Sequence, residues 1–190
     1  MSEDLYQREF DFDAAGADAT GDVWRPTLAH THAPSAQPFA VPAGAQELPH
    51  AVRAHSAIDR LMEANHPCVV AFSSGKDSSV VANLTLTTAA VRRAQGKPVP
   101  PIVVIHSDTG VENPEVRRLA DGELRKITRF ARQYGIPVQV RIGQPLLYSS
   151  WPVRVISGRA LPSFADSARD CSVEWKVRVG QRLTAVRFPA

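Results

Sequence analysis

The chain has 190 residues, of which 44% are hydrophobic and 22% are charged, a balance that is ordinary for a globular protein. Its two cysteines, Cys68 and Cys171, lie far apart in sequence, which excludes a disulfide scaffold and fits a reducing compartment. The acidic N-terminus has no signal-peptide core, and no apolar run approaches the roughly 20 residues that span a bilayer. These features predict a cytoplasmic protein that makes no membrane contact.

Charge is divided unevenly along the chain. Residues 1–50 hold two basic and eight acidic residues, whereas residues 51–190 hold 20 basic and 11 acidic residues. A basic domain behind an acidic leader favours anionic partners such as nucleotide phosphates or nucleic acid. Simple solubility explains an excess of this size equally well.

The first 50 residues are expected to form a poorly ordered leader. Ala, Gly, Pro, Asp and Thr dominate this segment, and its prolines interrupt every apolar pattern. Short pieces around residues 5–12 and 23–28 are candidates for docking on the domain. Residues 51–190 are then predicted to form a single domain, whose C-terminus stops without an obvious closing element.

From residue 51 onward, helical and strand patterns alternate. The predicted elements, in chain order, are a helix over 51–65, a strand over 68–72, a helix over 78–95, a strand over 102–105, a helix that begins at Asn113 and Pro114 and stops at Gly135, and a strand over 137–142. This order predicts an α/β fold, with a parallel twisted sheet and helices on both faces. The stretch after residue 143 looks irregular, apart from a basic, helical piece that begins at Cys171. Arg92 and Arg93, near the end of the second helix, are expected to be surface charges.

The turn after the first strand has the composition of a phosphate-binding loop. Its members are Ser73, Ser74, Gly75, Lys76, Asp77, Ser78 and Ser79. Small side chains allow backbone N–H groups to point at an anion, and the helix that follows adds the positive end of its dipole. A Walker A loop is excluded, because Val70 stands where that motif needs Gly and Asp77 where it needs Ser or Thr.

A second polar loop, 107–113, follows the next strand. Ligands of open parallel sheets bind beyond the carboxyl ends of the strands, so both loops are expected to face one crevice. Asp108 in this loop is a candidate for contact with a nucleotide or Mg²⁺, or for an Asx turn that shapes the loop. Glu112 would either position an acceptor or favour the N-terminus of the next helix.

Three segments carry a resemblance to a known superfamily. Residues 73–78 (Ser-Ser-Gly-Lys-Asp-Ser) resemble the Ser-Gly-Gly-x-Asp-Ser signature of PP-loop ATP pyrophosphatases, with Ser74 in place of a glycine. Residues 105–115 resemble the Asp-Thr-Gly loop of the PAPS reductase branch, and their Glu-Asn-Pro continuation resembles DndC-type sulfurtransferases of DNA phosphorothioation. Residues 169–178 resemble the downstream Cys…Lys…basic element that both branches share. The resemblance covers about residues 53–180 and implies an adenine nucleotide alpha hydrolase-like fold.

The resemblance also implies roles for individual residues. The first loop would bind the phosphates of ATP or PAPS through Ser73, Ser74, Gly75, Lys76, Asp77 and Ser78, and Lys76 and Asp77 would act in catalysis. Thr109 and Gly110 would let the second loop approach the nucleotide beside Asp108, which would also be the contact for Mg²⁺.

The downstream element would add a second set of charges. Arg169, Lys176 and Arg178 would face the anionic end of the ligand, or else form a solvated basic face. These cations would favour the thiolate of Cys171, which is the third candidate catalytic residue. An iron–sulfur cluster held by this chain alone is not expected, since Cys68 is read as a core residue of a strand. Trp151 and Trp175 would stack on a base or, more commonly for tryptophan, pack in the interior.

The implied reaction is attack of an acceptor on the α-phosphate of ATP, with release of pyrophosphate, followed by sulfur transfer. The Glu-Asn-Pro detail points to DNA as the acceptor, with a sulfur-donor protein or a completing subunit as a further partner. Reduction of PAPS or APS is the alternative, although the C-terminal Glu-Cys-Gly-Leu-His element of that family is not found before Ala190. A non-catalytic nucleotide-binding module is the third reading.

Overall fold

The parallel sheet predicted from the sequence is present. The computed structural model describes residues 7–8, 49–159 and 172–184. Its parallel strands are β2 (Cys68–Ala71), β3 (Ile102–Ser107) and β4 (Val138–Gly143), with β3 in the centre. The short strand β1 (Gln7–Arg8) joins the outer edge of β4 antiparallel, which gives the order β1-β4-β3-β2.

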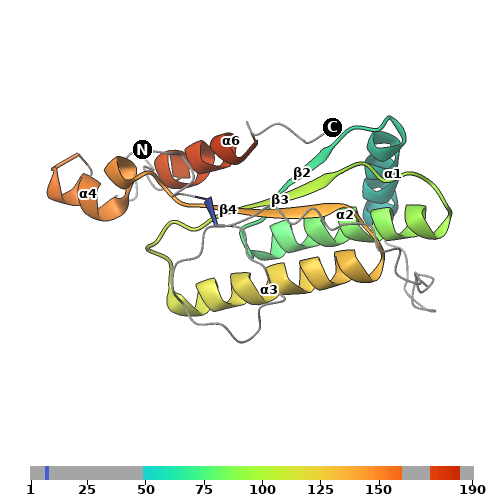
Figure 1. Ribbon diagram of the computed structural model, residues 1–190, viewed down its shortest axis with the longest axis horizontal. Coiled ribbons are helices and arrows are strands. Elements are labelled where there is room, and N and C mark those ends of the chain that lie inside the picture. The colour runs from blue at the N-terminus through green and yellow to red at the C-terminus, as the bar shows by residue number, and fades with distance from the viewer. Residues whose placement is uncertain (1–6, 9–48, 160–171, 185–190) are drawn as a thin grey trace.

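Helices cover both faces of this sheet, as predicted. The crossover helices α2 (Lys76–Ala94) and α3 (Pro114–Gln133) lie on one face, and α6 (Arg178–Thr184) packs on the other face against β3 and β4 (Figure 1). The first helix, α1 (Pro49–Glu63), packs against α2. Among the described residues, no helix combines the length and the apolar character that are needed to cross a bilayer.

The apolar run of β3 explains its central position. Ile102 and Val104 join the core that α2 and α3 cover, whereas Val103 and Ile105 pack against the α6 residues Val179 and Leu183. A strand that is covered on both sides needs apolar residues at every position, as is typical of parallel sheets.

The end of β4 is a glycine because α6 lies so close to it. A Cβ atom added at Gly143 would stand 2.8 Å from Val179 Cγ1 and 3.0 Å from Leu183 Cδ1. Even a methyl group would therefore force these side chains, or α6 itself, to shift. Arg141, a buried residue of β4, also connects β4 to α6, because its Nη1 donates a hydrogen bond to the carbonyl oxygen of Leu183 at 2.8 Å.

The predicted ends of α3 are confirmed. Asn113 is the N-cap, and its Oδ1 accepts the N–H of Glu115 at 2.8 Å, while Pro114 occupies the first turn. Gly135 follows the C-cap Tyr134 with a φ of 61°, the left-handed conformation that favours glycine after a helix.

The region after β4 is more regular than the sequence predicts. It contains a 3-10 turn η2 (Leu147–Ser149), a short helix α4 (Trp151–Ile156), a π-helical turn η3 (Val173–Val177) and α6. The helical piece expected near the C-terminus is confirmed over 172–184, but α4 was missed because six residues are too few to show helical periodicity. Most of the leader lies outside the described residues. Within it, β1 lies in the 5–12 piece that was expected to dock, and the 23–28 piece lies outside the described residues.

Arg92 is not the surface charge that the sequence predicted. Its side chain is 1% exposed and reaches Asp59 Oδ1 at 2.8 Å and Glu63 Oε2 at 2.7 Å, both on α1. Its Nε donates to the carbonyl oxygen of Pro98 at 3.1 Å. The hydrogen bond to Asp59 is the largest of several effects that raise the pKa of the guanidinium, against the opposing effect of burial. Arg92 therefore ties α1 to α2, whereas Arg93 is exposed as expected.

Candidate functional site

The first loop is closed by a residue of the helix that follows it. Ser78 Oγ accepts the N–H of Ser73 at 3.2 Å and donates to the carbonyl oxygen of Gly75 at 3.0 Å. The N-cap of α2 is Gly75, which has no side chain to offer to the first amides of the helix. These amides lie at the positive end of the helix dipole, an arrangement that favours an anion.

Ser74 has the backbone conformation that a glycine would adopt without strain. Its φ is 59°, in the left-handed region that serine rarely enters. Its Oγ donates to the carbonyl oxygen of Ser73 at 2.6 Å, which helps to hold the turn. Such a conformation costs about 1 kcal/mol or more in a non-glycine residue and is often found at functional loops. The position where the PP-loop signature has glycine is thus the one where this loop needs a positive φ.

The second loop is organised around a buried carboxylate. Asp108 is 8% exposed, and its Oδ1 accepts the N–H of Gly110 at 3.1 Å, which forms the Asx turn considered above. Its Oδ2 accepts from Gln144 Nε2 at 3.0 Å and lies 3.1 Å from Arg117 Nη2. Thr109 is buried, and its Oγ1 accepts the N–H of Val111 at 3.4 Å. Asp108 therefore links its loop to α3 and to the segment after β4.

These contacts do not fit a magnesium site built by the protein. Both oxygens of Asp108 already have partners, and one partner is a guanidinium that neutralises the carboxylate. Within the described residues, no group of three or more His, Cys, Asp or Glu side chains stands ready to hold a metal ion. We therefore assign no step to a protein-bound metal.

A cavity of about 350 Å³ lies beyond the carboxyl ends of β2 and β3. All three motif segments contribute to its wall: Ser73 from the first loop, Glu112 from the second, and Lys176 from η3. The rest of the lining is mainly apolar or backbone, and consists of Ala71, Phe72, Ile105, His106, Ser107, Val177 and Gly180. Ser107 Oγ also donates to the carbonyl oxygen of Lys176 at 3.4 Å, which joins β3 to η3 across the cavity.

The other predicted residues are placed less uniformly. Lys76 and Asp77 are exposed in the first turn of α2, three and four residues beyond Ser73 of the cavity wall. Arg178 turns to Glu174, with Nη1 2.9 Å from Oε2, and is not part of the lining. Arg169 and Cys171 lie outside the described residues.

Cys68 and Trp175 have structural roles and are not part of the cavity wall. Cys68 begins β2, and burial raises the pKa of its thiol, so the thiolate is disfavoured there. Trp175 is buried in η3, and its Nε1 donates to the carbonyl oxygen of Ser149 at 2.6 Å. It packs in the interior rather than offering a face for stacking, whereas Trp151 is 43% exposed.

His106 is a residue of the cavity that the sequence analysis did not single out. It is 6% exposed, and its Nδ1 lies 2.8 Å from the carbonyl oxygen of Phe72, the residue before the first loop. The sequence gives only a weak indication of this role, which is a single histidine between a buried apolar run and the polar Ser-Asp-Thr-Gly loop.

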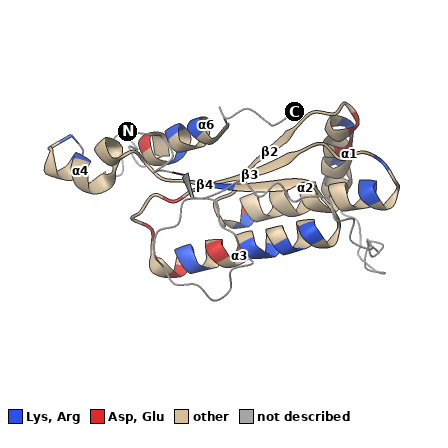
Figure 2. Ribbon diagram, in the orientation of Figure 1, with Lys and Arg blue, Asp and Glu red and all other residues tan. Residues whose placement is uncertain are grey.

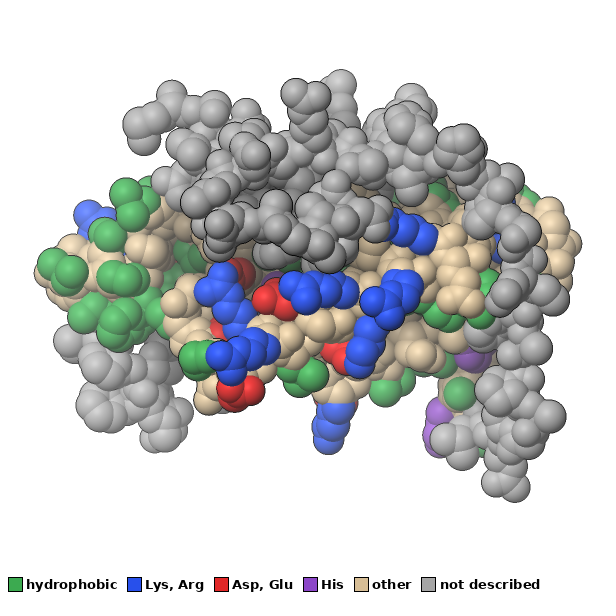
Figure 3. Space-filling model, turned by 60° about the horizontal axis from the view of Figure 1, so that its bottom comes forward, with side chains coloured by type: hydrophobic (Ala, Val, Ile, Leu, Met, Phe, Trp, Pro, Cys, Tyr) green, Lys and Arg blue, Asp and Glu red, His purple; other side chains and the backbone are tan. Residues whose placement is uncertain are grey.

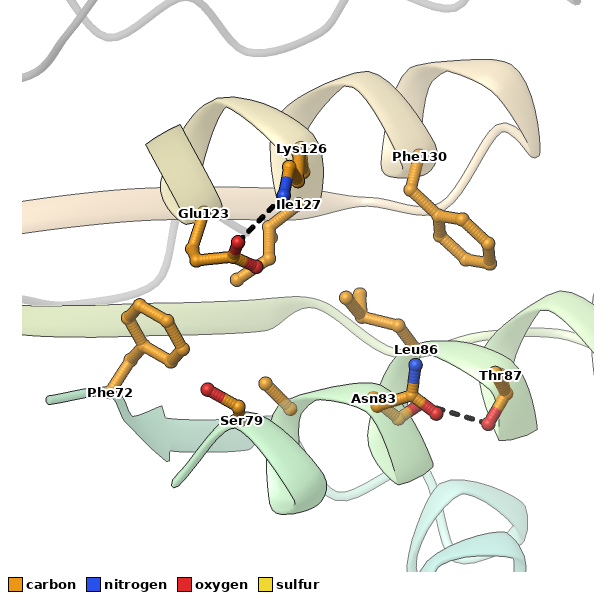
Figure 4. A pocket seen from close by; sticks show the side chains of 10 residues that line it. Phe72, Ser79, Asn83, Leu86, Thr87, Glu123, Lys126, Ile127 and Phe130 are labelled. Carbon is orange, nitrogen blue, oxygen red and sulfur yellow. Dashed lines mark hydrogen bonds and ion pairs between the residues drawn. The ribbon is translucent and has the colours of Figure 1, made fainter. Parts of the chain in front are cut away.

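A second hollow, of about 240 Å³, lies between α2 and α3 (Figure 4). Phe72, Leu86, Ile127 and Phe130 give it apolar walls, and an ion pair joins Glu123 to Lys126 at 2.8 Å. Ser79 is its one contribution from the first loop, and neither the second loop nor η3 reaches it. It is thus less suited to a phosphate than the cavity beyond the strands.

Comparisons of the chain with protein-family models, with curated proteins and with solved structures find no match.

Proposed function

We propose that the cavity beyond β2 and β3 binds an adenine nucleotide, ATP or PAPS, in an adenine nucleotide alpha hydrolase-like site. The observation that carries this proposal is that one cavity is lined from all three segments, by Ser73 of the first loop, by Ser107 and Glu112 of the second, and by Lys176 of η3. The polyphosphate lies along the first loop and the first amides of α2, close to Lys76. The base occupies the apolar part, between Ile105 and Val177.

The proposed chemistry is attack of an acceptor on the α-phosphate, with cleavage of the bond to the β-phosphate and release of pyrophosphate. Lys76 and Lys176 neutralise charge on the phosphates, and the helix amides hold them in place. Mg²⁺ enters as the counter-ion of the nucleotide. We assign Glu112, the carboxylate of the cavity wall, to the acceptor, because a carboxylate would repel the phosphates. Sulfur from a donor protein then attacks the adenylated acceptor and displaces AMP, with Asp77 and Cys171 as the remaining catalytic candidates.

The test measures the affinities of ATP, PAPS and AMP by isothermal titration, together with the products formed from ATP and PAPS. ATP is expected to bind at least about tenfold more tightly than AMP, because AMP lacks the β- and γ-phosphates that the loop would hold. Release of pyrophosphate from ATP supports the pyrophosphatase reading, and sulfite release from PAPS with thioredoxin supports the reductase reading. Binding without turnover supports a non-catalytic module. Equal affinity for ATP and AMP contradicts a polyphosphate cradle.

A specific surface favours nucleic acid as the acceptor. Arg118, Arg125, Arg129 and Arg132 are exposed on α3, at spacings that place them on one side of the helix. In Figure 2 the Lys and Arg positions run along α3 with a few Asp and Glu positions among them, and in Figure 3 basic side chains extend across that face with acidic side chains between them. The row spans about 21 Å, too long for one phosphate but comparable with the axial rise over about six base pairs of a duplex. Gly122 lies within the row, and nothing stands within 4 Å of the place of its Cβ, so a backbone can approach there.

Replacing these four arginines by glutamine is expected to reduce the salt dependence of duplex DNA binding. The slope of log affinity against log salt should fall by about three to four, because each lost phosphate contact removes about 0.9. Fluorescence anisotropy at several salt concentrations measures this slope. The matched control replaces Arg53, Arg60, Arg93 and Lys97, which are also exposed, by glutamine. An equal fall in the control, or none in the α3 variant, contradicts a nucleic-acid site on α3.

A further inference from the structure

His106 holds the peptide group at which the sheet ends and the phosphate loop begins. The last backbone hydrogen bond between the β2 side and β3 is donated by the N–H of Phe72 to the carbonyl oxygen of Ile105 at 2.8 Å. The carbonyl oxygen of Phe72 is then met by a side chain, with His106 Nδ1 at 2.8 Å. Because a carbonyl oxygen only accepts, Nδ1 must carry the proton in this contact.

The other end of the same peptide group is held as well. Its N–H belongs to Ser73 and donates to Ser78 Oγ at 3.2 Å. Since a peptide group is planar, a donor on its oxygen and an acceptor on its nitrogen together fix its orientation. The next residue is Ser74, whose positive φ of 59° depends on the direction in which the chain leaves the sheet. His106 and Ser78 therefore act on the loop from opposite sides.

The surroundings of His106 keep its ring in place. The residue is 6% exposed, and its ring lies 6.4 Å from the ring of Phe72, which is 4% exposed. A buried ring with one fixed hydrogen bond has little freedom to turn. It lies at the cavity wall and directly behind the loop.

We propose that His106 is a positioning residue, which orients the Phe72–Ser73 peptide group so that the phosphate loop is set to receive a polyphosphate. This inference rests on the proposed function for the identity of the ligand. It makes no use of a charge on His106, since the contact needs only the proton on Nδ1.

The test uses two substitutions in the full chain. His106→Leu removes the donor, and His106→Asn keeps a donor near the place of Nδ1. Titration with ATP should show affinity about five- to tenfold weaker for the leucine variant, and within about threefold of the original for the asparagine variant. Adenosine, which lacks phosphates, should lose less affinity than ATP does in His106→Leu. Unchanged ATP affinity in His106→Leu, or equal losses for ATP and adenosine, overturns the proposal.

Hydrogen exchange separates this inference from the proposed function. The Ser73 amide should exchange faster in His106→Leu than in the original protein, and the rate should be restored in His106→Asn. Ser78→Ala, which removes the acceptor on the other side of the peptide group, should give the same acceleration. If the original protein does not bind ATP, the proposed function fails, and the exchange rates still decide whether His106 orients the loop. Unchanged exchange at Ser73 in His106→Leu overturns the inference, even where Ser78→Ala accelerates it.

Discussion

Replacing Lys76 and Lys176 together by alanine is expected to weaken ATP binding by about 100-fold. Each lysine would make a charge-assisted hydrogen bond to a phosphate. Because both side chains are exposed to water, the loss of each should weaken ATP affinity by about tenfold, near the lower limit for such hydrogen bonds. Lys76 stands in the first turn of α2 and Lys176 in the cavity wall, so the two charges approach the ligand from different elements. Isothermal titration at constant ionic strength measures the loss.

The matched control for this pair is Arg93→Ala with Lys97→Ala. These residues are also exposed and carry the same total charge, but they lie near the other end of α2. Their replacement should change ATP affinity by less than about twofold, because distant exposed charges are screened. An equal loss in both variants would mean that ATP responds to net charge alone and that the cavity does not hold it.

The largest effect on stability is expected for Arg92→Met, which should lower the free energy of unfolding by about 2–3 kcal/mol. Methionine fills the buried site with an apolar side chain. It cannot make the ion pairs with Asp59 and Glu63 or the hydrogen bond to the carbonyl oxygen of Pro98. The loss should stay below that of a fully buried pair, because the carboxylates of Asp59 and Glu63 are 43% and 66% exposed and remain hydrated. Urea unfolding followed by circular dichroism measures the change.

Arg93→Met is the control at the neighbouring position. Arg93 is exposed, so its replacement should alter the free energy of unfolding by no more than about 0.5 kcal/mol. Similar values for the two variants would show that the contact between α1 and α2 does not depend on Arg92.

The parts of the fold that local sequence determines were predicted well. Asn113, Pro114 and Gly135 mark the ends of α3 through capping and backbone conformation, which depend on a few neighbouring residues. The three parallel strands follow from short apolar runs between helical patterns, and their order along the chain places both loops at one edge. A cavity that Ser73, Ser107 and Glu112 line together lies at that edge.

The features that were missed depend on contacts between distant segments. Arg92 is buried because two carboxylates 29 and 33 residues earlier face it, and nothing near Arg92 in sequence indicates this. Asp108 is paired with Arg117 and Gln144, so its availability to a ligand is settled only by the folded chain. His106 acts on Phe72, 34 residues away, through its side chain. Pattern and composition identify elements and loops, but they do not identify such partners.

A crystal structure of the protein with ATP would show where the nucleotide binds. The phosphates are predicted to lie against residues 73–78 and the first amides of α2, with the base beside Ile105 and Val177. ATP bound instead in the hollow between α2 and α3, beside Phe130 and away from Lys176, would contradict this account.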